Sequence, residues 1–394
     1  MLKKSTIFIA TGGTGGHIMP ARSLALELEN QGFEVIILGD NKYRFYIKQS
    51  DNFVSKIISS SKLEKSIIKL FFAVLKISYG ILQSLFLFLK FRPKYIFAFG
   101  GYATFPILIA AIFTKTKIIL HEQNAHLGKV NRIFANYADK IALSFKETSG
   151  ILDEFLSKTV FTGNPVRQEI IELNALNYTL PSFTLEDVVE KKSENKMGYD
   201  VLLASDFYQD RIEKKPEFFN ILIIGGSGGA KIFSEILPKA FFNLKEFLKE
   251  RISITQQCRK ELIDSTFAQY KSFNVSVTID DFFEDMQGLI KNAHLVIARA
   301  GSSSIFEFCA AKKPMILIPF ALSADNHQEK NAKYIEKNGA AIVVKEEDFN
   351  INKITNLLNE LLHNHYKLNE MSKNASNLAA LDAVQNLSKI INGK

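Results

Sequence analysis

The stretch TIFIATGGTGGH, residues 6–17, joins a short apolar run to a glycine-rich loop. The run is rich in β-branched and apolar residues, which favour a buried strand. Pro20 follows the loop, in a position typical of the first turn of a helix, and Gly32 ends that helix. Residues 34–38, EVIIL, form a second apolar run. The segment therefore predicts a strand, a glycine loop, a helix and a further strand in succession.

The same order returns about 210 residues later, in the stretch NILIIGGSGGA, residues 220–230. Residues 233–248 then have the composition of a helix. The chain has 394 residues, and a single hydrophobic core rarely grows beyond about 250–300 residues. The two units therefore predict an α/β fold with two Rossmann-like domains. Because ligands bind at the carboxyl ends of parallel strands, we expect both loops to face a central cleft.

Glycines at these positions let backbone N–H groups approach an anion at a helix N-terminus. A dinucleotide-binding enzyme is one alternative, because Asp40 ends the second strand as a ribose-binding acid would. However, Ile18 stands where the G-x-G-x-x-G fingerprint, counted from Gly13, needs its last glycine. A nicotinamide or flavin enzyme thus stays open from this half of the chain, although the loop does not favour it.

The overall composition excludes a disordered chain, because 47% of the residues are apolar. The two cysteines, Cys258 and Cys309, have no metal-type or redox-type spacing, which indicates a reducing compartment. The first apolar run is too short for the core of a signal peptide. We therefore expect it to be the first strand of a cytoplasmic protein.

Positive charge gathers in residues 41–94, which hold eleven Lys or Arg against two acidic residues. The whole chain carries +8, so the remainder is close to neutral. Such a local excess indicates a local anionic partner, either acidic lipid or nucleic acid. Inside this region, residues 67–89 are mostly apolar, and a polar side chain recurs every seven positions, at Lys62, Lys69, Lys76, Gln83 and Lys90.

The two lysines inside the apolar run argue against a transmembrane span, because each costs about 2.5–3.5 kcal/mol at a bilayer centre. The pattern predicts an amphipathic helix that offers an apolar and basic surface to an anionic membrane. A helix packed on a sheet, with solvated lysines, is the alternative. RNA binding would require aromatic and basic residues interleaved on an exposed sheet, so we expect no nucleic-acid partner.

Five further motifs fall in expected loops. They are Phe99-Gly100-Gly101-Tyr102, His121-Glu122-Gln123-Asn124, Gly163-Asn164-Pro165-Val166-Arg167, the run from Arg299 to Glu307, and Asp325-Asn326-His327-Gln328. With the two glycine loops they make seven motifs in order. Together they resemble the MurG-type UDP-N-acetylglucosamine transferases of bacterial peptidoglycan synthesis. The resemblance extends to about Ala341 and implies the GT-B architecture, in which the active site lies between two Rossmann-like domains.

The resemblance implies an inverting transfer of N-acetylglucosamine from UDP-N-acetylglucosamine to a muramyl-pentapeptide on a pyrophosphoryl-undecaprenol lipid. It also implies a peripheral location on the cytoplasmic face of the inner membrane. A related GT-B glycosyltransferase with another acceptor would share the donor loops, and it is the closest alternative. We expect no cofactor and no metal, because Asp280-Asp281 lies outside the donor loops.

The site residues carry over by position. The first glycine loop gives Thr14, Gly15 and Gly16, and the end of the His121-Glu122-Gln123-Asn124 motif gives Asn124. The expected donor residues are Arg167, Ser227, Ser302, Ser303, Ser304, Ile305, Phe306, Glu307 and Gln328, with Phe283 at a position that meets uracil through its backbone. The expected acceptor residues are Gly100, Gly101 and Tyr102. For Arg167 a domain-interface ion pair is the alternative, and the serines suit a helix cap equally well.

The expected roles follow from side-chain chemistry. The Glu307 carboxylate can accept both ribose hydroxyls, and the Gln328 amide can both donate to and accept from a sugar. Two helix N-termini can stabilise the departing diphosphate. A base must take the acceptor proton, and we favour His17, because imidazole exchanges protons near neutral pH. His121 and Glu122 are reserve candidates that can instead shape the acceptor pocket.

We expect an N-terminal, acceptor-side domain over residues 1–162 and a donor domain over residues 218–369. A last helix, 371–391, is expected to cross back onto the first domain. Residues 163–217 link the two, and within them 173–216 form an unusually long connection that suggests a surface insertion.

Overall fold

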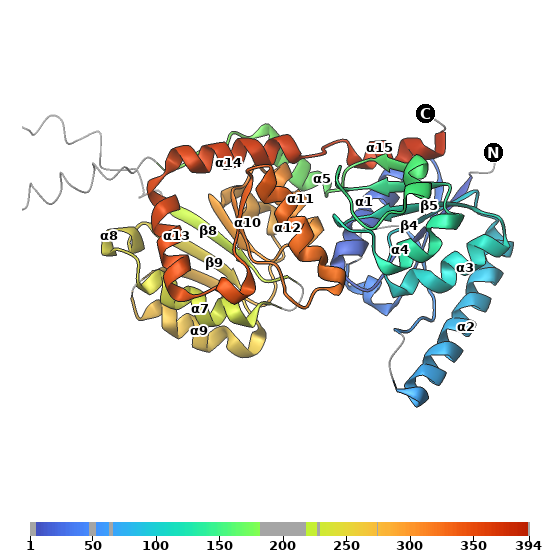
Figure 1. Cartoon of the computed structure of the whole chain (residues 1–394), viewed down its shortest axis with the longest axis horizontal. Helices are drawn as coiled ribbons and strands as arrows, with labels where there is room; N and C mark the ends of the chain where they lie inside the picture. Colours follow the sequence, from blue (N-terminus) through green and yellow to red (C-terminus); the bar gives the residue numbers. More distant parts are fainter. Residues whose placement is uncertain are drawn as a thin grey trace, which may run out of the picture.

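The computed structural model describes residues 5–46, 53–62, 66–181, 218–226, 229–273 and 275–392. Two parallel β-sheets, each covered by helices, lie side by side along the long axis of the molecule (Figure 1). The expected α/β fold with two Rossmann-like domains is therefore confirmed. Most of the expected insertion, like Ser227 in the second glycine loop, lies outside the described residues.

The first sheet has seven parallel strands in the order β3-β2-β1-β4-β5-β6-β7. Their bounds are β1 Thr6–Ala10, β2 Glu34–Gly39, β3 Val54–Ile57, β4 Tyr95–Ala98, β5 Lys117–Glu122, β6 Lys140–Leu143 and β7 Thr159–Phe161. Every residue of β1 is buried, as the β-branched and apolar run requires. The helices of this half are α1 Gly15–Asn30, α2 Ile67–Phe91, α3 Phe105–Phe113 and α4 Lys129–Phe134. The short helix α5, Gln168–Ile171, follows in the connection and packs Ile170 into the core of the second domain.

The second sheet has the order β10-β9-β8-β11-β12-β13. Its strands are β8 Phe219–Ile224, β9 Ile252–Gln257, β10 Ser276–Asp280, β11 Leu295–Ala298, β12 Met315–Leu317 and β13 Ala341–Val343. Its helices are α7 Lys231–Phe242, α8 Glu246–Lys249, α9 Ile263–Lys271, α10 Met286–Asn292, α11 Ser302–Ala310, α12 His327–Lys337 and α13 Ile351–His363. Both sheets reverse their strand order once, beside β1 and beside β8, and binding crevices form at such switch points.

Pro20 lies deeper in the first helix than the sequence suggests. The helix α1 begins at Gly15, so Pro20 falls inside it rather than in its first turn. Proline has no N–H, so it leaves the carbonyl of residue i−4, here Gly16, without its helical partner. That carbonyl is free for a partner from another element.

The C-terminal segment forms two helices, where the sequence predicts one over 371–391. The helix α14, His365–Leu378, packs Leu368 and Met371 into the core of the second domain. The chain then turns, and α15, Ala383–Lys389, places Leu387 in the core of the first domain (Figure 1). The two helices let one continuous segment contribute side chains to the cores of both domains.

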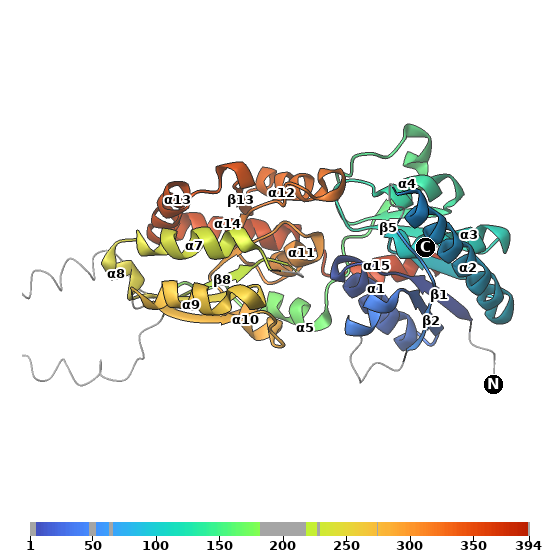
Figure 2. The same ribbon diagram turned by 90° about the horizontal axis from the view of Figure 1, so that it is seen from below.

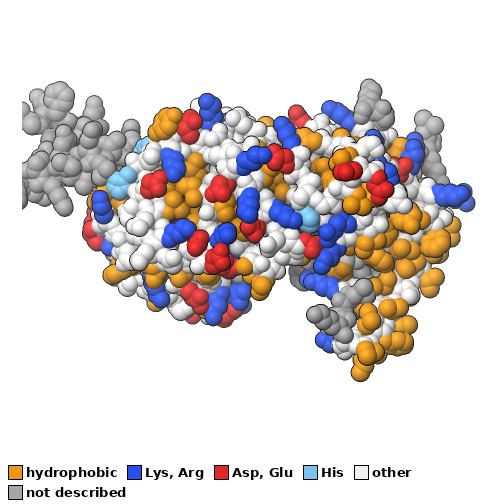
Figure 3. Space-filling view, in the orientation of Figure 1, with side chains coloured by type: hydrophobic (Ala, Val, Ile, Leu, Met, Phe, Trp, Pro, Cys, Tyr) orange, Lys and Arg blue, Asp and Glu red, His pale blue; other side chains and the backbone are white. Residues whose placement is uncertain are grey.

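The helix α2 leaves much of its apolar surface uncovered. Its 25 residues are long and apolar enough to cross a bilayer by length and composition. Its inner face contacts α3, and Gly80 lies so close to the Ser59 carbonyl that no side chain would fit there. The outer face carries exposed side chains at about helical spacing, Ile67, Phe71, Leu75, Tyr79, Leu82, Phe86 and Leu89. Figure 3 shows a broad hydrophobic surface over this part of the first domain.

Candidate functional site between the two domains

The first glycine loop meets the second domain directly. The Ser303 hydroxyl, on the first turn of α11, donates a hydrogen bond to the Gly16 carbonyl at 3.0 Å. Figure 2 shows α1 and α11 next to each other at the junction of the domains. The expected residues Thr14, Gly15 and Gly16 therefore lie beside the expected serines of α11. Two helix N-termini thus meet at one place, where their dipoles favour an anion.

Asp40 holds the first loop in shape. Its carboxylate accepts a hydrogen bond from the Gly13 N–H at 3.2 Å and another from the Tyr102 hydroxyl at 2.8 Å. Burial, together with the hydrogen bond to Asp40, raises the pKa of Tyr102 to about 12, so its hydroxyl stays a donor. The acid that the sequence offered as a ribose ligand is therefore engaged within the protein, which removes the main support for a dinucleotide site.

Glu122 organises the loop after β5. It is buried, and its two carboxylate oxygens accept hydrogen bonds from four donors, which are the Asn124 backbone, the Asn124 side chain, Gly128 and Asn131 at 2.8–3.0 Å. Because four protein donors occupy both oxygens, the carboxylate is poorly placed to take a proton from substrate. The geometry favours the pocket-shaping role for Glu122 over the reserve role of base.

His121 is equally enclosed. It has no exposed surface, and burial, the largest cause, lowers its pKa to about 4. Its Nε2 contacts the Gly163 carbonyl at 3.3 Å and its Nδ1 contacts the Gln123 amide at 2.9 Å. Both ring nitrogens are therefore occupied by protein groups. The favoured candidate base, His17, is only half-buried at the start of α1, and its Nδ1 lies 2.8 Å from Gln123 Oε1.

Asn331 on α12 ties this loop to the second domain. It is fully buried, and its Oδ1 accepts a hydrogen bond from the Ala125 N–H at 2.8 Å. Its Nδ2 donates to Asn124 Oδ1 and to the Ala300 carbonyl, both at 3.1 Å. One amide thus joins the expected ligand Asn124 to the loop before α11. The sequence places Asn331 after a motif but gives no signal that its partner lies 206 positions away.

Arg167 and Glu307 face each other in a bidentate ion pair. Arg167 Nε lies 2.7 Å from Glu307 Oε1, and its second nitrogen lies 2.9 Å from Oε2. The two side chains are only 15% and 13% exposed. Burial by itself would lower the pKa of Arg167, but the hydrogen bonds and charge of Glu307 outweigh it, so the pKa is raised. An ion pair of Arg167 is therefore present, and the neighbouring Ile170 packs in the core of the second domain, while the donor-binding role of Arg167 stays a prediction.

The remaining expected residues are placed as follows. Ile305 and Phe306 are buried in the core of the second domain, so only their backbone can meet a ligand. Gln328 Oε1 accepts hydrogen bonds from the Ala300 and Phe320 N–H groups at 3.2 and 2.9 Å. Phe283 lies half-buried in the loop after β10. Gly101 has a positive φ and faces the His17 ring, and Gly100 faces Asn131.

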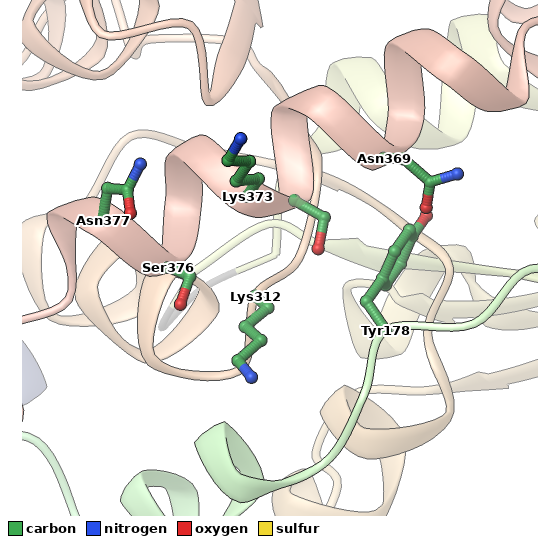
Figure 4. Close-up of a pocket in the computed structure, with 7 residues that line it drawn as sticks. Tyr178, Lys312, Asn369, Lys373, Ser376 and Asn377 are labelled. Carbon is green, nitrogen blue, oxygen red and sulfur yellow. The ribbon is translucent and has the colours of Figure 1, made fainter.

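A separate cavity of about 280 Å³ lies away from these residues, between α14 and the chain near Tyr178 (Figure 4). Polar and basic side chains line it, among them Lys312, Lys373, Asn369 and Ser376. None of the expected site residues contributes to it. In the part of the chain that the structure describes, no group of three or more His, Cys, Asp or Glu side chains lies together as a metal site requires.

Comparison with known proteins agrees with this arrangement. Residues 7–143 match the Glycosyltransferase family 28 N-terminal domain, and residues 220–387 match the Glycosyltransferase family 28 C-terminal domain. Two curated relatives carry the name UDP-N-acetylglucosamine–N-acetylmuramyl-(pentapeptide) pyrophosphoryl-undecaprenol N-acetylglucosamine transferase. The one from Wolbachia pipientis subsp. Culex pipiens is 36% identical, and the one from Wolbachia sp. subsp. Drosophila simulans is 34% identical. In both cases the match covers 98% of this chain and 98% of the relative.

Among solved structures, the crystal structure of Acinetobacter baumannii MurG matches with a TM-score of 0.72 and 25% identity. The match covers 99% of this chain and all of that one. The motif order, the two switch-point loops and the near full-length relatives point to one family. The chain therefore belongs to the MurG-type glycosyltransferases of family 28.

Proposed function

We propose that the protein transfers N-acetylglucosamine from UDP-N-acetylglucosamine to the lipid-linked muramyl-pentapeptide acceptor of peptidoglycan synthesis. The observation that carries the proposal is the contact between Ser303 and Gly16, because it brings the loops of both Rossmann-like domains to one junction. A donor held by the second domain can therefore meet an acceptor held by the first. The printed names of the curated relatives supply the substrate pair.

The donor lies against α11 in this proposal. Glu307 accepts the ribose hydroxyls, and Arg167 turns from Glu307 toward the diphosphate when the donor arrives. Arg167 then exchanges a carboxylate for the diphosphate, and the Glu307 oxygens exchange the guanidinium for two hydroxyl donors, so neither charged group is left without a hydrogen bond. Gln328 meets the sugar through Nε2, since its Oε1 is held by two backbone N–H groups. Ser227 and the backbone of Phe283, Ile305 and Phe306 complete the donor site.

The acceptor lies against the first glycine loop, near Gly100, Gly101 and Tyr102, with Asn124 at the boundary between the two substrates. The acceptor oxygen attacks the anomeric carbon and forms the new C–O bond. The bond from that carbon to the diphosphate oxygen breaks, and UDP leaves with the electron pair. The acceptor proton passes to His17 Nε2. Positive potential at the starts of α1 and α11 stabilises the departing diphosphate.

The membrane partner is assigned to α2 and the basic residues around it. The exposed apolar face of α2 inserts into the interfacial layer of an anionic membrane, and lysines of the 41–94 region contact lipid headgroups. A peripheral position suits α2 better than a span, because its inner face packs on α3 and on the loop at Ser59. In this proposal the protein lies on the cytoplasmic face of the inner membrane, where its acceptor is anchored.

The deciding experiment measures transfer of labelled N-acetylglucosamine from UDP-N-acetylglucosamine to a lipid-pyrophosphoryl-muramyl-pentapeptide analogue. Wild type, Glu307→Ala and the exposed control Glu235→Ala on α7 are compared. We expect transfer by wild type and Glu235→Ala, with a large loss in Glu307→Ala. If the folded wild type binds UDP-N-acetylglucosamine but transfers no sugar, another acceptor is favoured. If it neither binds the donor nor transfers the sugar, the proposal is refuted.

A further inference from the structure

A chain of hydrogen bonds runs from His17 into the core of the first domain. His17 Nδ1 lies 2.8 Å from Gln123 Oε1, and Gln123 Nε2 lies 2.9 Å from His121 Nδ1. His121 Nε2 lies 3.3 Å from the Gly163 carbonyl. Gln123 is 1% exposed and His121 is fully buried, so water does not compete for these contacts. The directions of the bonds are therefore set by the protein groups alone.

One backbone carbonyl fixes the orientation of the Gln123 amide. Gln123 Nε2 also contacts the His121 carbonyl oxygen at 3.0 Å, and a carbonyl can only accept. The NH₂ group must therefore face His121, and Oε1 must face His17. A second carbonyl gives the same direction from the other end, because Gly163 can only accept from His121 Nε2. His121 then carries its proton on Nε2, and its Nδ1 is free to accept from Gln123.

The consequence reaches His17. Its Nδ1 faces an amide oxygen, which has no proton to give, so Nδ1 must carry the hydrogen and donate it. In the neutral ring the lone pair then lies on Nε2. A side chain on Gly101 would come within 3.6 Å of that nitrogen, and glycine leaves the space beside it open. We infer that Gln123 is a positioning residue that holds His17 in the Nδ1–H form and so presents Nε2 as the proton acceptor.

This inference rests on the proposed role of His17 as base, and it extends that role. Free histidine favours the other tautomer, with the proton on Nε2, in which Nε2 has no lone pair to take the acceptor proton. When the acceptor hydroxyl gives its proton to Nε2, the ring becomes a cation, and Nδ1–H continues to donate to Gln123 Oε1. No proton has to move along the chain, because an amide does not titrate. Gln123 thus acts by orientation and by stabilising the charged ring.

The test combines a tautomer measurement with kinetics on the full chain. Protein labelled with ¹⁵N-histidine gives long-range ¹H–¹⁵N spectra of its seven histidines, and the His17→Gln spectrum assigns His17. Wild type is compared with Gln123→Leu, which removes the acceptor, and with Gln123→Glu, which keeps an oxygen facing Nδ1. Gln269→Leu, at a half-buried position on α9 of the second domain, is the matched control. The same proteins are assayed for kcat and for KM of UDP-N-acetylglucosamine.

We expect the Nδ1–H form in wild type, Gln123→Glu and Gln269→Leu, and its loss in Gln123→Leu. We expect kcat of Gln123→Leu to fall by up to about 10²–10⁴-fold, the contribution typical of a positioned base, with KM for the donor nearly unchanged. A wild-type His17 protonated on Nε2 would overturn the inference, as would an Nδ1–H form that persists in Gln123→Leu. If Gln123→Leu does not fold, loss of the Nδ1–H form in Gln123→Glu overturns it in the same way. If Gln123→Leu changes the tautomer of His17 but leaves kcat unchanged, Gln123 has no catalytic role. That outcome would also show that His17 is not the base.

Discussion

The Ser303 hydroxyl donates a hydrogen bond to the Gly16 carbonyl, 287 residues earlier in the chain, because Pro20 leaves that carbonyl without its helical partner. The helical hydrogen bond that Pro20 cannot make in α1 is replaced by a hydrogen bond between the two domains. The contact joins the starts of two helices, and any ligand held between them meets both. The following predictions begin from this relationship.

Replacing Pro20 by alanine restores an N–H that competes with Ser303 for the Gly16 carbonyl. Proline inside a helix costs about 3 kcal/mol relative to alanine, so we expect Pro20→Ala to raise the free energy of unfolding by about 1–3 kcal/mol. We expect kcat/KM to fall several-fold at the same time, since the junction of the two loops loosens. Thermal unfolding and steady-state transfer measure the two effects, and Ser303→Ala should lower activity without the gain in stability. A Pro20→Ala variant in which stability and kcat/KM both rise, or both fall, would contradict this account.

The Arg167–Glu307 pair predicts unequal effects of two substitutions. Glu307→Gln keeps the side-chain shape but removes the charge, and we expect KM for UDP-N-acetylglucosamine to rise by about 10–100-fold, since hydrogen bonds to a charged group contribute about 1.5–3 kcal/mol. Arg167→Met leaves the Glu307 carboxylate half-buried without its cation, so we expect it to destabilise the fold in addition. Donor titration and chemical denaturation separate the two. Equal stability of wild type and Arg167→Met would show that the pair is not held in solution.

Asn331→Leu tests the buried contact between the domains. The substitution leaves the Ala125 N–H and the Ala300 carbonyl without their partner, at a cost of about 1–3 kcal/mol for each group. We expect a lower melting temperature and a lower kcat, because Asn124 also loses a hydrogen bond that fixes its side chain. Asn377→Leu on α14, outside the junction, is the control. A variant that loses stability but keeps full activity would assign Asn331 a purely structural role.

The low pKa of His121 predicts a pH-dependent stability. Its pKa is lowered to about 4 in the folded protein, first by burial, against about 6.5 in an unfolded chain. Between these values the unfolded state binds a proton that the folded state does not, so stability falls as the pH drops from about 6.5 to 4. The full effect is about 3 kcal/mol. Denaturation at several pH values should show that the free energy of unfolding depends less on pH in His121→Phe than in wild type. His294, whose pKa is also lowered to about 4, contributes equally to the pH dependence of both proteins. An equal pH dependence of stability in the two proteins would contradict the assignment of this effect to His121.

The α2 surface predicts reversible binding to anionic vesicles. Replacing Leu82, Phe86 and Leu89 by serine removes three side chains that are 64–67% exposed, and we expect partitioning into vesicles with acidic lipid to fall at least tenfold. Transfer to an acceptor in vesicles should fall with it, while transfer to a water-soluble short-chain acceptor should not. Phe242→Ser with Tyr366→Ser, exposed on the second domain, is the control. Binding that resists high salt and carbonate extraction would instead indicate that α2 spans the bilayer.

Much of the fold follows from short stretches of sequence. The apolar runs before the loops at Gly12 and Gly225 predict buried strands, and the glycines after them predict tight turns into helices, because both depend on neighbouring residues only. The helical repeat in α2 is local in the same sense, whereas the exposure of its outer apolar face is seen only in the tertiary structure. The resemblance to MurG-type transferases likewise rests on motifs that can be read along the chain.

Relationships between distant residues were settled only by the tertiary structure. The sequence places Pro20 in a first turn and the last helix in one piece. In the structure α1 begins five residues before Pro20, and the last segment is divided between two separate cores. The sequence names His17 as a base but gives no sign of Gln123, 106 positions away, which orients the ring. The physical reason is that hydrophobic periodicity records which face of an element is buried, not what it is buried against. A buried polar group must find a partner once the chain has folded, and that requirement selects the pairs that make the site.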